Sequence, residues 1–575
     1  MERKRRLIAR AAVAHRLDGT LPSVLQRVYA ARGLVDMGDL ALDLGRMLPP
    51  DGLKGLDTAV ELLAAAIADG RKIVIAGDYD ADGATGVALG MLGFKALGAA
   101  AVDYVVPNRV TMGYGLSPAL AAIAHELGAQ VLVTVDNGIA SVAGVAAARA
   151  LGMQVVVTDH HLPGPELPEA DALVNPNQPG CGFESKSLAG VGVMFYLLVA
   201  LRSCLRERGH FAIRPEPKLA DWLDLVAVGT VADVARLDRN NRILVAQGLA
   251  RLRAGRARPG LLAMLATASR DPAAITATDL GFVLGPRINA AGRLADIRTG
   301  IECLLADDTD LARSLAETLE RINRERREIQ RSMTEDAIVQ IAEDLDDTRA
   351  GVTVFDEDWH EGVVGPVASR IKERVNRPVI AFAPSQDPSV LKGSARSIPG
   401  LNVRDAIALV DSRHPALIER FGGHAMAAGL TVSKSRYRQF QQAFDLACRE
   451  LLPPGWNDAG LETDGELQPA ELSVQTALQI ERGGPWGAGF EEPRFDNCFD
   501  VVEARIVGAD GTHVKYRLRL ADQAAESRVE YGAIDFGGAA RLCRKGRIRA
   551  AYMLAVNRFR DRESLDLRLD YLSEL

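Results

Sequence analysis

The chain contains 575 residues, of which 48% are hydrophobic, and it carries a formal net charge of −7. This length and composition are typical of a globular protein with three or four domains. The acidic balance excludes a uniformly basic nucleic-acid coat, although a local basic channel is compatible with it.

Cysteine usage and the absence of targeting signals favour the cytoplasm. Six scattered cysteines form no Cys-x-x-Cys pair, which disfavours a zinc site and a disulfide framework. The basic start is similar to a signal peptide, but Arg10 and His15 interrupt its apolar region. The longest apolar run, Leu188–Leu201, is too short to span a bilayer and is predicted to be a core helix. We therefore expect a cytoplasmic protein without a membrane partner.

The first 300 residues are predicted to form a cap and an α/β domain. Residues 1–50 look helical and partly basic, with breaks at Pro22, Pro49 and Pro50. Residues 51–307 follow as an α/β domain, in which strand and helix patterns alternate up to about residue 200. The helices are predicted at Asp57–Ala68, Thr85–Leu97, Pro118–Leu127 and Val142–Leu151. Such alternation indicates βαβ units and a parallel sheet.

Three strand-like runs in this domain end in carboxylate or imidazole side chains. They are Lys72–Ala76 before Asp78, Asp80 and Asp82, Val131–Val135 before Asp136, and Val155–Thr158 before Asp159, His160 and His161. Continuous apolar runs fit strands that are buried on both faces of a parallel sheet, and the carboxyl ends of such strands meet at one edge. Carboxylates suit hard divalent cations, and manganese also accepts imidazole. The pattern therefore predicts a metal centre at this edge.

Other interpretations of these clusters are weaker. Asp78, Asp80, Asp82 and Gly83 match the start of an EF-hand loop, but the twelfth position is Leu89 instead of Glu, and a strand replaces the expected helix. The glycine motifs of nucleotide-binding loops are absent. For each acidic turn taken alone, a helix cap or a turn is the simpler explanation, and only the combination of three clusters favours metal ligands.

Two later segments of the α/β domain carry further candidate residues. Asp221–Val234 is predicted to be an apolar helix that ends near Asp233, which would supply another ligand or a helix cap. In the stretch GPRINAAGRL, the side chains of Arg287, Asn289 and Arg293 lie between glycines and suit phosphate contacts. A surface loop with salt bridges explains the same spacing.

A long helix and a second α/β domain are predicted next. Residues 308–345 contain neither Gly nor Pro and are rich in Arg and Glu, which is typical of a solvated linking helix. Residues 346–455 return to an α/β pattern. Glycines there lie beside Ser394, Arg396 and His424, and such neighbours suit the approach of a phosphate to the backbone. A tight turn at the glycines and a packed histidine are the alternatives.

The last part, residues 456–575, is predicted to form a small, OB-like β-barrel. In Thr512–Leu520, the basic residues Lys515, Arg517 and Arg519 alternate with apolar residues. A barrel with one basic face fits single-stranded nucleic acid, and an ordinary half-exposed strand explains the alternation equally well.

The ordered motifs resemble those of the DHH phosphoesterase family. GDYDADG, DNG, DHH and GTVADV follow one another in the family's order, and the Gly-Gly-His segment resembles the family's associated C-terminal domain. Together with GPRINAAGRL and FGGHAMAAG, the set is highly specific and covers the chain from about residue 70 to its end. The chain is similar to the bacterial branch of this family, which degrades single-stranded DNA from 5′ to 3′.

This resemblance implies a centre of two Mn²⁺ or Mg²⁺ ions. The implied ligands are Asp80, Asp82, Asp136, His160 and Asp233, with Asp136 bridging the ions. Some family members carry a His at the position of Ala76, and Asp78 or water would replace it here. His161 would hold the scissile phosphate, and Asp159 would orient the neighbouring imidazole.

The resemblance also implies the substrate contacts and the partners. The phosphate contacts would come from Arg287, Asn289, Arg293, Arg370, Ser394, Arg396, Gly422, Gly423 and His424, and the barrel would add Lys515, Arg517 and Arg519. The products would be nucleoside 5′-monophosphates, made during DNA recombination and repair. A monomer that works with single-strand-binding protein and a RecQ-type helicase is expected.

Three other functions fit parts of the sequence. A DHH-type phosphodiesterase for short oligonucleotides or dinucleotides would use the same metal cluster, but the basic strand favours a long polymer. A non-catalytic DNA-binding scaffold conflicts with the complete set of carboxylates. A dinucleotide-binding oxidoreductase would need the glycine fingerprint that is missing here.

Overall fold

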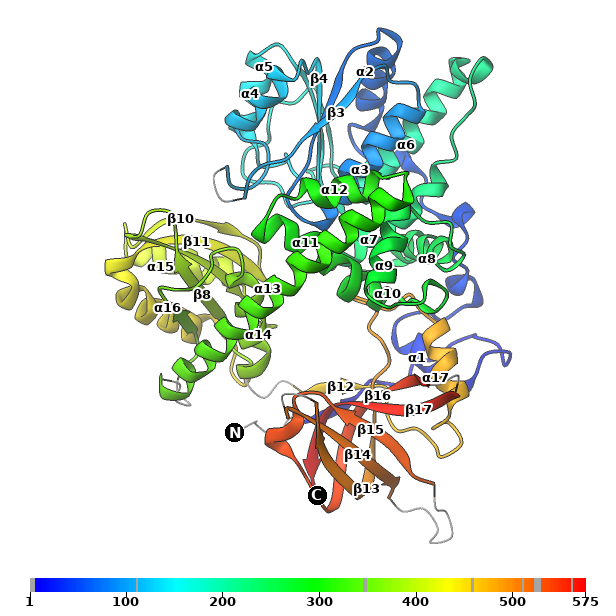
Figure 1. The fold of residues 1–575 in the computed structure, drawn as a ribbon, viewed down its shortest axis with the longest axis vertical. Coiled ribbons are helices and arrows are strands. Elements are labelled where there is room, and N and C mark those ends of the chain that lie inside the picture. The colour runs from blue at the N-terminus through cyan, green and yellow to red at the C-terminus, as the bar shows by residue number, and fades with distance from the viewer. Residues whose placement is uncertain are drawn as a thin grey trace. The chain divides into compact units, whose positions relative to one another are not determined.

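The computed structural model describes residues 6–109, 112–344, 349–456, 460–508, 511–521, 529–559 and 562–575 (Figure 1). The chain forms two compact units. The first consists of Met1–Asn289, Ile297–Glu317 and Gly460–Leu575, and the second consists of Ala290–Asp296 and Thr318–Ala459. None of the helices in the described ranges is long and apolar enough to cross a membrane.

The first unit contains a five-stranded parallel sheet with the strand order β3-β2-β4-β5-β6. Its strands are β2 (Ile73–Ala76), β3 (Val102–Val105), β4 (Val131–Val135), β5 (Gln154–Thr158) and β6 (Ala172–Val174). Every residue of β2 and β4 is buried, as expected for strands that are covered on both faces. The parallel sheet predicted from the apolar runs is therefore confirmed.

Helices cover both faces of this sheet (Figure 1). They are α2 (Leu56–Ala68), α3 (Ala81–Ala96) and α6 (Gly190–Glu207) on one face, and α4 (Pro118–Glu126) and α5 (Val142–Ala150) on the other. The predicted helices are confirmed, although α3 starts four residues earlier than expected. A Cβ at Gly90 of α3 would lie 2.7 Å from Ile75 Cδ1, so the missing side chain allows the helix to approach β2 closely. The predicted core helix lies in α6, which is buried from Gly190 to Leu198.

A helical region follows the sheet. Its elements are α7 (Leu223–Ala232), α8 (Arg239–Arg253), α9 (Pro259–Thr267), α10 (Ala277–Asp279), the π-helical turn η7 (Leu280–Leu284), α11 (Gly285–Leu294) and α12 (Arg298–Leu305). The surface-loop alternative for GPRINAAGRL is wrong, because this stretch forms α11. Pro286 is the second residue of α11, which continues directly from η7, and the alanines at 290 and 291 favour a helix.

The two terminal parts of the chain pack together in the first unit. β1 (Leu7–Ala9) pairs in parallel with β12 (Leu461–Thr463). The described N-terminal residues also form one α-helix, α1 (Ser23–Ala31), and the short turns η1 (Met37–Leu40), η2 (Leu44–Arg46) and η3 (Pro50–Gly52). Tyr29 of α1 donates a hydrogen bond to Gly483 O at 2.8 Å, just after α17 (Val474–Arg482).

The C-terminal part of the first unit is a closed barrel with the order β13-β14-β15-β17-β16. Its strands are β13 (Phe495–Val507), β14 (His513–Leu520), β15 (Tyr531–Asp535), β16 (Gly546–Phe559) and β17 (Arg562–Glu574). In β14, Val514, Tyr516 and Leu518 are buried, and the basic residues between them are not. The predicted alternation and the predicted small barrel are confirmed.

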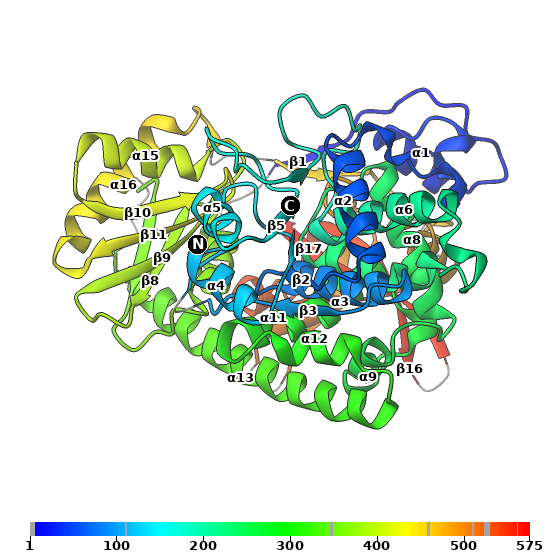
Figure 2. The same ribbon diagram turned by 90° about the horizontal axis from the view of Figure 1, so that it is seen from above.

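The second unit is an α/β sandwich around a sheet with the order β10-β11-β9-β8-β7 (Figure 2). The strands are β7 (Val352–Phe355), β8 (Val379–Pro384), β9 (Val390–Arg396), β10 (Ile418–Gly423) and β11 (Ala427–Ser433). One core joins the sheet to α13 (Thr309–Asp344) and α14 (Val364–Val375), and a second core joins it to α15 (Val403–Arg413) and α16 (Tyr437–Leu451). The 36-residue α13 confirms the predicted long helix.

Candidate metal centre and catalytic site

The first acidic cluster lies where β2 ends and α3 begins. Asp80 caps α3, because its carboxylate accepts hydrogen bonds from the N–H groups of Asp82 and Gly83 at 3.1 and 3.0 Å. The Asp82 carboxylate accepts hydrogen bonds from the N–H groups of Gly190 and Val191 at 2.6 and 2.9 Å, at the start of α6. Helix N-termini attract carboxylates, so α6 holds Asp82 in place. A strand, a cap and a helix here rule out the EF-hand alternative.

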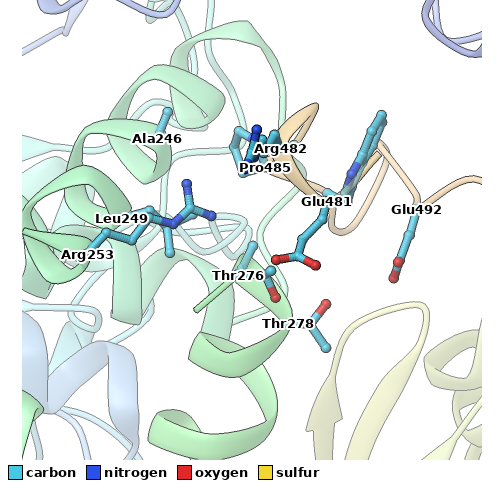
Figure 3. A pocket seen from close by; sticks show the side chains of 12 residues that line it. Ala246, Leu249, Arg253, Thr276, Thr278, Glu481, Arg482, Pro485 and Glu492 are labelled. Carbon is cyan, nitrogen blue, oxygen red and sulfur yellow. The ribbon is translucent and has the colours of Figure 1, made fainter. Parts of the chain in front are cut away.

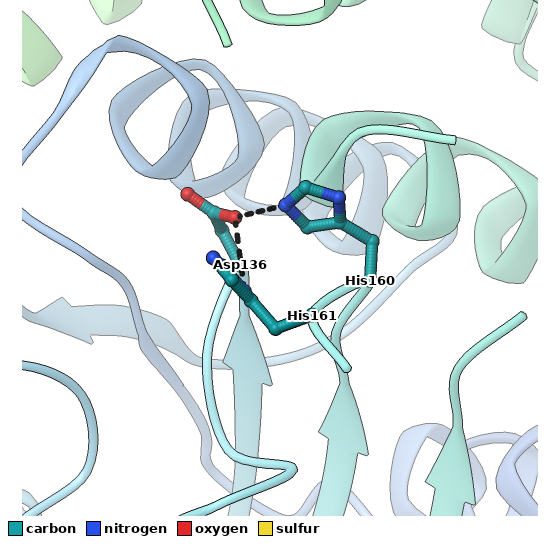
Figure 4. Close-up of side chains that lie close together, drawn as sticks. All are labelled: Asp136, His160 and His161. Atoms are coloured by element: carbon teal, nitrogen blue, oxygen red, sulfur yellow. Dashed lines mark ion pairs between the residues drawn. The ribbon is translucent and has the colours of Figure 1, made fainter. Parts of the chain in front are cut away.

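The ends of β4 and β5 bring the other two clusters to the same place. Asp136 follows β4 directly and has a φ of 61°, which Asp adopts more readily than most residues. His160 Nε2 lies 3.0 Å from Asp136 Oδ1, and His161 Nδ1 lies 4.0 Å from the same oxygen (Figure 4). Because β4 and β5 are adjacent and parallel, their carboxyl ends meet at one edge of the sheet.

Asp233 reaches this edge from the C-terminal end of α7. Its Oδ2 lies 3.7 Å from His160 Nε2, and Asp82 Oδ2 lies 3.9 Å from the same nitrogen. Three overlapping groups have ligand atoms within 4.8 Å of one another: Asp82, His160 and Asp233; Asp78, Asp80 and Asp136; and Asp136, His160 and His161. Asp136 and His160 each belong to two of these groups.

The electrostatics of the cluster fit bound cations. Burial raises the pKa of Asp78, Asp136 and Asp233 well above its ordinary range, and neighbouring carboxylates raise it further. Burial, followed by the charge of Asp80, raises the pKa of Asp82 to about 7. Buried carboxylates of this density ionise together only when positive charge compensates them. Asp78 Oδ1 is also buried and makes no hydrogen bond within the described residues, so the cluster has the free oxygen that a divalent cation requires.

Asp159 and His161 form a hydrogen-bonded pair beside the cluster. Burial opposes the ionisation of Asp159, but hydrogen bonds from His161 Nδ1 at 2.7 Å and from the Ile139 N–H at 2.9 Å outweigh it and lower the pKa. Burial likewise disfavours a charged His161, but the bond to Asp159 raises the pKa of His161 to about 9. A protonated His161 can hold an anionic phosphate oxygen.

Two residues at this site were not predicted from the sequence. The Tyr114 hydroxyl donates a hydrogen bond to Asp136 O at 2.9 Å and lies 3.1 Å from His161 Nδ1. The available signal was its position between Gly113 and Gly115, which both adopt positive φ. The second residue is Gly190, which lies directly against Asp136. A Cβ added at Gly190 would lie 2.5 Å from Asp136 Cβ. No local pattern indicates that contact.

The candidates on α11 have structural partners. Asn289 Oδ1 accepts a hydrogen bond from the Ala81 N–H at 2.8 Å, so Asn289 supports the loop of the first acidic cluster. Arg287 is only 7% exposed and donates a hydrogen bond to Val283 O at 2.7 Å. In the second unit, Arg293 donates a hydrogen bond to Gly362 O at 3.2 Å. The three side chains thus have different surroundings, although they share one helix.

Ser394 and Arg396 lie together on β9 in the second unit. Arg396 Nη1 donates a hydrogen bond to Ser394 Oγ at 3.0 Å, and Arg396 Nε donates one to Ser369 Oγ of α14 at 3.2 Å. A Cβ at Gly365, in the first turn of α14, would lie 2.9 Å from Arg396 Nη2. Arg370 lies on the surface of α14, with Nη1 3.3 Å from Glu373 Oε2.

Both alternatives for the Gly-Gly-His segment are wrong. Gly422 and Gly423 pair with Gly429 and Ala428 in the β10–β11 ladder, so they do not form a tight turn. Gly423 needs the freedom of glycine because its φ is 141°. His424 is exposed in the connection to β11, so it is not a packed histidine.

The basic row of β14 is partly neutralised by an acidic residue of β13 and by one just before β15. Arg517 Nε lies 3.0 Å from Glu503 Oε2, and Arg519 Nη2 lies 3.1 Å from Glu530 Oε1. Lys515 continues the row. Exposed ion pairs of this kind are weak, so a phosphate can compete for the arginines. The face is nevertheless less positive than the sequence of β14 alone suggested.

A pocket of about 210 Å³ lies between α8, α10 and the end of α17. Figure 3 shows Arg253 and Glu481 on opposite sides of it. Glu481 accepts a hydrogen bond from Arg558 Nη2 at 3.0 Å, and Trp486 stacks on Phe490 with ring centroids 5.0 Å apart. None of the candidate metal ligands is among its described lining residues, so this pocket is separate from the metal centre.

Three family models match the chain. They are the DHH family, N-terminal domain, at residues 72–230, the DHHA1 domain at residues 347–450, and the RecJ OB domain at residues 463–571. The first match contains all candidate metal ligands except Asp233. The third match supports the OB-like barrel that the strand pattern predicted.

Curated relatives and solved structures match over nearly the full chain. A protein of Dickeya dadantii named single-stranded-DNA-specific exonuclease RecJ is 48% identical over 97% of both chains. The Escherichia coli protein of the same name is 46% identical over 96% of both chains. The crystal structure of RecJ from Thermus thermophilus in complex with Mn²⁺ is 29% identical, covers 96% of this chain and 76% of its own, and has a TM-score of 0.77. The corresponding complex with Mg²⁺ is 28% identical, with coverages of 96% and 74% and a TM-score of 0.73.

Proposed function

This chain belongs to the RecJ family of single-stranded-DNA-specific exonucleases, and on that basis we propose that it degrades single-stranded DNA from 5′ to 3′ into nucleoside 5′-monophosphates. The observation that carries the proposal is the cluster of buried aspartates and histidines at the carboxyl edge of the first sheet. Such a cluster suits phosphodiester hydrolysis with two metal ions.

Two Mn²⁺ or Mg²⁺ ions would be held by the overlapping ligand groups. The proposed ligands are Asp78, Asp80, Asp82, Asp136, His160 and Asp233, and Asp136 belongs to two of the three groups. Bound divalent cations lower the pKa of the attacking water and neutralise charge that develops on the phosphate. The protein contributes the fixed geometry, because α6 holds Asp82 and the cap of α3 holds Asp80.

His161 would bind the scissile phosphate in its charged form. Asp159 favours that form and fixes the ring through the 2.7 Å hydrogen bond to Nδ1. Tyr114 contacts the same ring and the carbonyl of Asp136, so it would hold His161 in register with the metal centre. Prepositioned donors of this kind stabilise the transition state without reorganisation.

The direction of cleavage would come from the second unit. Ser394, Arg396, Gly422, Gly423 and His424 are proposed to bind the 5′-terminal phosphate, with Arg287, Asn289, Arg293 and Arg370 as further phosphate contacts. The hydrogen bond between Arg396 and Ser394 prepares two donors on one face of β9. The barrel would hold the incoming strand through Lys515, Arg517 and Arg519.

We further propose that the protein acts in DNA recombination and repair in the cytoplasm, as a monomer. Single-strand-binding protein and a RecQ-type helicase are its proposed partners. These assignments rest on membership of the RecJ family.

Digestion of three end-labelled substrates in Mn²⁺ tests the function directly. We would compare a single strand, a duplex, and a single strand with a blocked 5′ end, each with a chelator control. Mononucleotides released from the free single strand alone would support the proposal. Cleavage that is confined to dinucleotides, with long strands untouched, would instead support a short-oligonucleotide phosphodiesterase.

In the metal-free protein, the free energy of unfolding should fall as the pH rises from 3.8 to about 7. The folded-state pKa of Asp82 is raised from 3.8 to about 7, so the folded protein binds this proton more tightly than the unfolded chain. The contribution of Asp82 is therefore complete below pH 3.8 and is lost as the pH rises through about 7. Mn²⁺ needs ionised ligands, so it should raise Tm more at about pH 8 than at about pH 5. Calorimetry with and without chelator measures both effects. If the stability of Asp82→Asn in chelator falls as steeply with pH as that of the unsubstituted protein, the prediction is wrong.

The double variant Arg517→Ala with Arg519→Ala should weaken strand binding and its salt dependence. Each lost phosphate contact reduces the slope of log K against log salt by about 0.7 for a single strand. Because Glu503 and Glu530 compete for these arginines, we expect a change below about 1.4 for the pair. Glu530→Gln serves as the matched control and should shift affinity in the opposite direction. Anisotropy of a labelled oligothymidylate in chelator measures both variants, and unchanged affinity in both would remove this face from the substrate path.

A further inference from the structure

The sheet of the second unit has an open edge at β7. Among the described residues, β7 pairs only with β8. The Val352 N–H donates a hydrogen bond to Pro378 O at 2.9 Å, so alternation along the strand points the N–H and C=O groups of Thr353 and Phe355 away from β8. Gln340 of α13 donates a hydrogen bond to Phe355 O at 3.1 Å, which agrees with that direction.

A pocket of about 510 Å³ lies along this edge. Its walls come from the end of α13 and from the start of α16, which pack on opposite faces of the sheet. The pocket therefore continues the plane of the sheet between two helical layers. A further strand, placed about 4.8 Å from β7, would lie in this space.

The described part of the pocket lining includes polar and positively charged side chains. Arg349 and Arg438 contribute two guanidinium groups, and Gln340, Gln441 and Gln442 contribute amides. No Asp or Glu is among the described lining residues. The outward N–H and C=O groups of Thr353 and the outward N–H of Phe355 match the backbone of an extended peptide, and the guanidinium group of Arg438 favours an acidic side chain on that peptide.

We propose that the β7 edge binds an extended, acidic peptide segment of a partner protein, which adds as a strand to the sheet of the second unit. Hydrogen bonds to the N–H and C=O of Thr353 and to the N–H of Phe355 would supply affinity, and Arg438 would select the charge. The partner's strand would lie between α13 and α16. This binding is independent of the metal centre, so it does not depend on the proposed function.

The full-length protein can be tested with two labelled peptides of about six residues, one alternating valine with glutamate and one alternating valine with lysine. Anisotropy gives the affinity, and hydrogen exchange of residues 352–355 gives the place of binding. We expect the acidic peptide alone to bind and to slow exchange there. Arg438→Glu should weaken binding about tenfold or more. Arg404→Glu reverses an exposed charge on α15, outside the pocket lining, and should leave binding unchanged.

Thr353→Pro supplies a second test of strand addition. It removes the Thr353 N–H, which faces the open edge, and leaves in place the N–H groups that donate to β8. Edge strands tolerate proline at positions whose N–H faces away from the paired strand. Binding should be lost, while cleavage of single-stranded DNA by this variant and by Arg438→Glu stays normal. Equal binding of both peptides, or binding without protection of residues 352–355, would overturn the proposal. The proposal would also be overturned if an oligothymidylate, or a higher protein concentration alone, slowed hydrogen exchange of residues 352–355.

Discussion

Asp136→Asn is expected to abolish strand cleavage while the protein still folds and binds single strands. Asp136 belongs to two of the three possible ligand groups, and its Oδ1 lies 3.0 Å from His160 Nε2. Loss of residues that only orient metal ligands typically costs about 10–100-fold in activity or metal affinity, so loss of a shared ligand should cost more than about 100-fold. Asn also tolerates the positive φ at this position.

The same variant should stabilise the metal-free protein. Burial and four neighbouring aspartates raise the pKa of Asp136, so removing its ionisable group removes a cost of folding near neutral pH. Single-turnover cleavage, strand binding in chelator and Tm in chelator measure the three effects. Asp57→Asn, an exposed carboxylate at the start of α2, is the matched control and should change none of them. Normal turnover by Asp136→Asn would refute the proposal that Asp136 is a metal ligand.

Gly190→Ala should disable the site by steric displacement, without removing any ligand. The added Cβ would lie 2.7 Å from Asp136 Cα, which is backbone and cannot rotate away. Either Asp136 or the start of α6 must move, and Asp82 depends on α6 for two hydrogen bonds. A misplacement of about 1 Å can cost about 100-fold in rate, and overpacking costs about 1–3 kcal/mol of stability.

Gly192→Ala in the same helix separates this effect from ordinary helix overpacking. Its Cβ would meet Leu188 Cδ2 at 3.2 Å, the far end of a flexible side chain. We expect near-normal cleavage from Gly192→Ala and a strong loss from Gly190→Ala, together with a smaller Mn²⁺-induced rise in Tm. Equal activity of the two variants would show that the contact with Asp136 does not position the ligands.

The sequence determined the elements of the metal centre because their signals are local. The apolar runs before Asp78, Asp136 and Asp159 have the pattern of strands buried on both faces, and parallel strands bring their carboxyl ends to one edge. Long uninterrupted periodicity likewise predicted α13, and the alternation in β14 predicted one face of the barrel. Each of these features depends on residues that lie within a few positions of one another.

Tertiary structure decided which groups these side chains meet. The N–H groups that hold Asp82 come from α6, 108 and 109 positions later in the chain, and the space that Asp136 occupies depends on the missing side chain of Gly190. Arg517 and Arg519 form a basic row in the sequence, but Glu503 and Glu530 approach them only in the closed barrel. Periodicity specifies which face of an element is apolar, whereas these contacts follow from how separate elements pack, and no pattern within one segment encodes them.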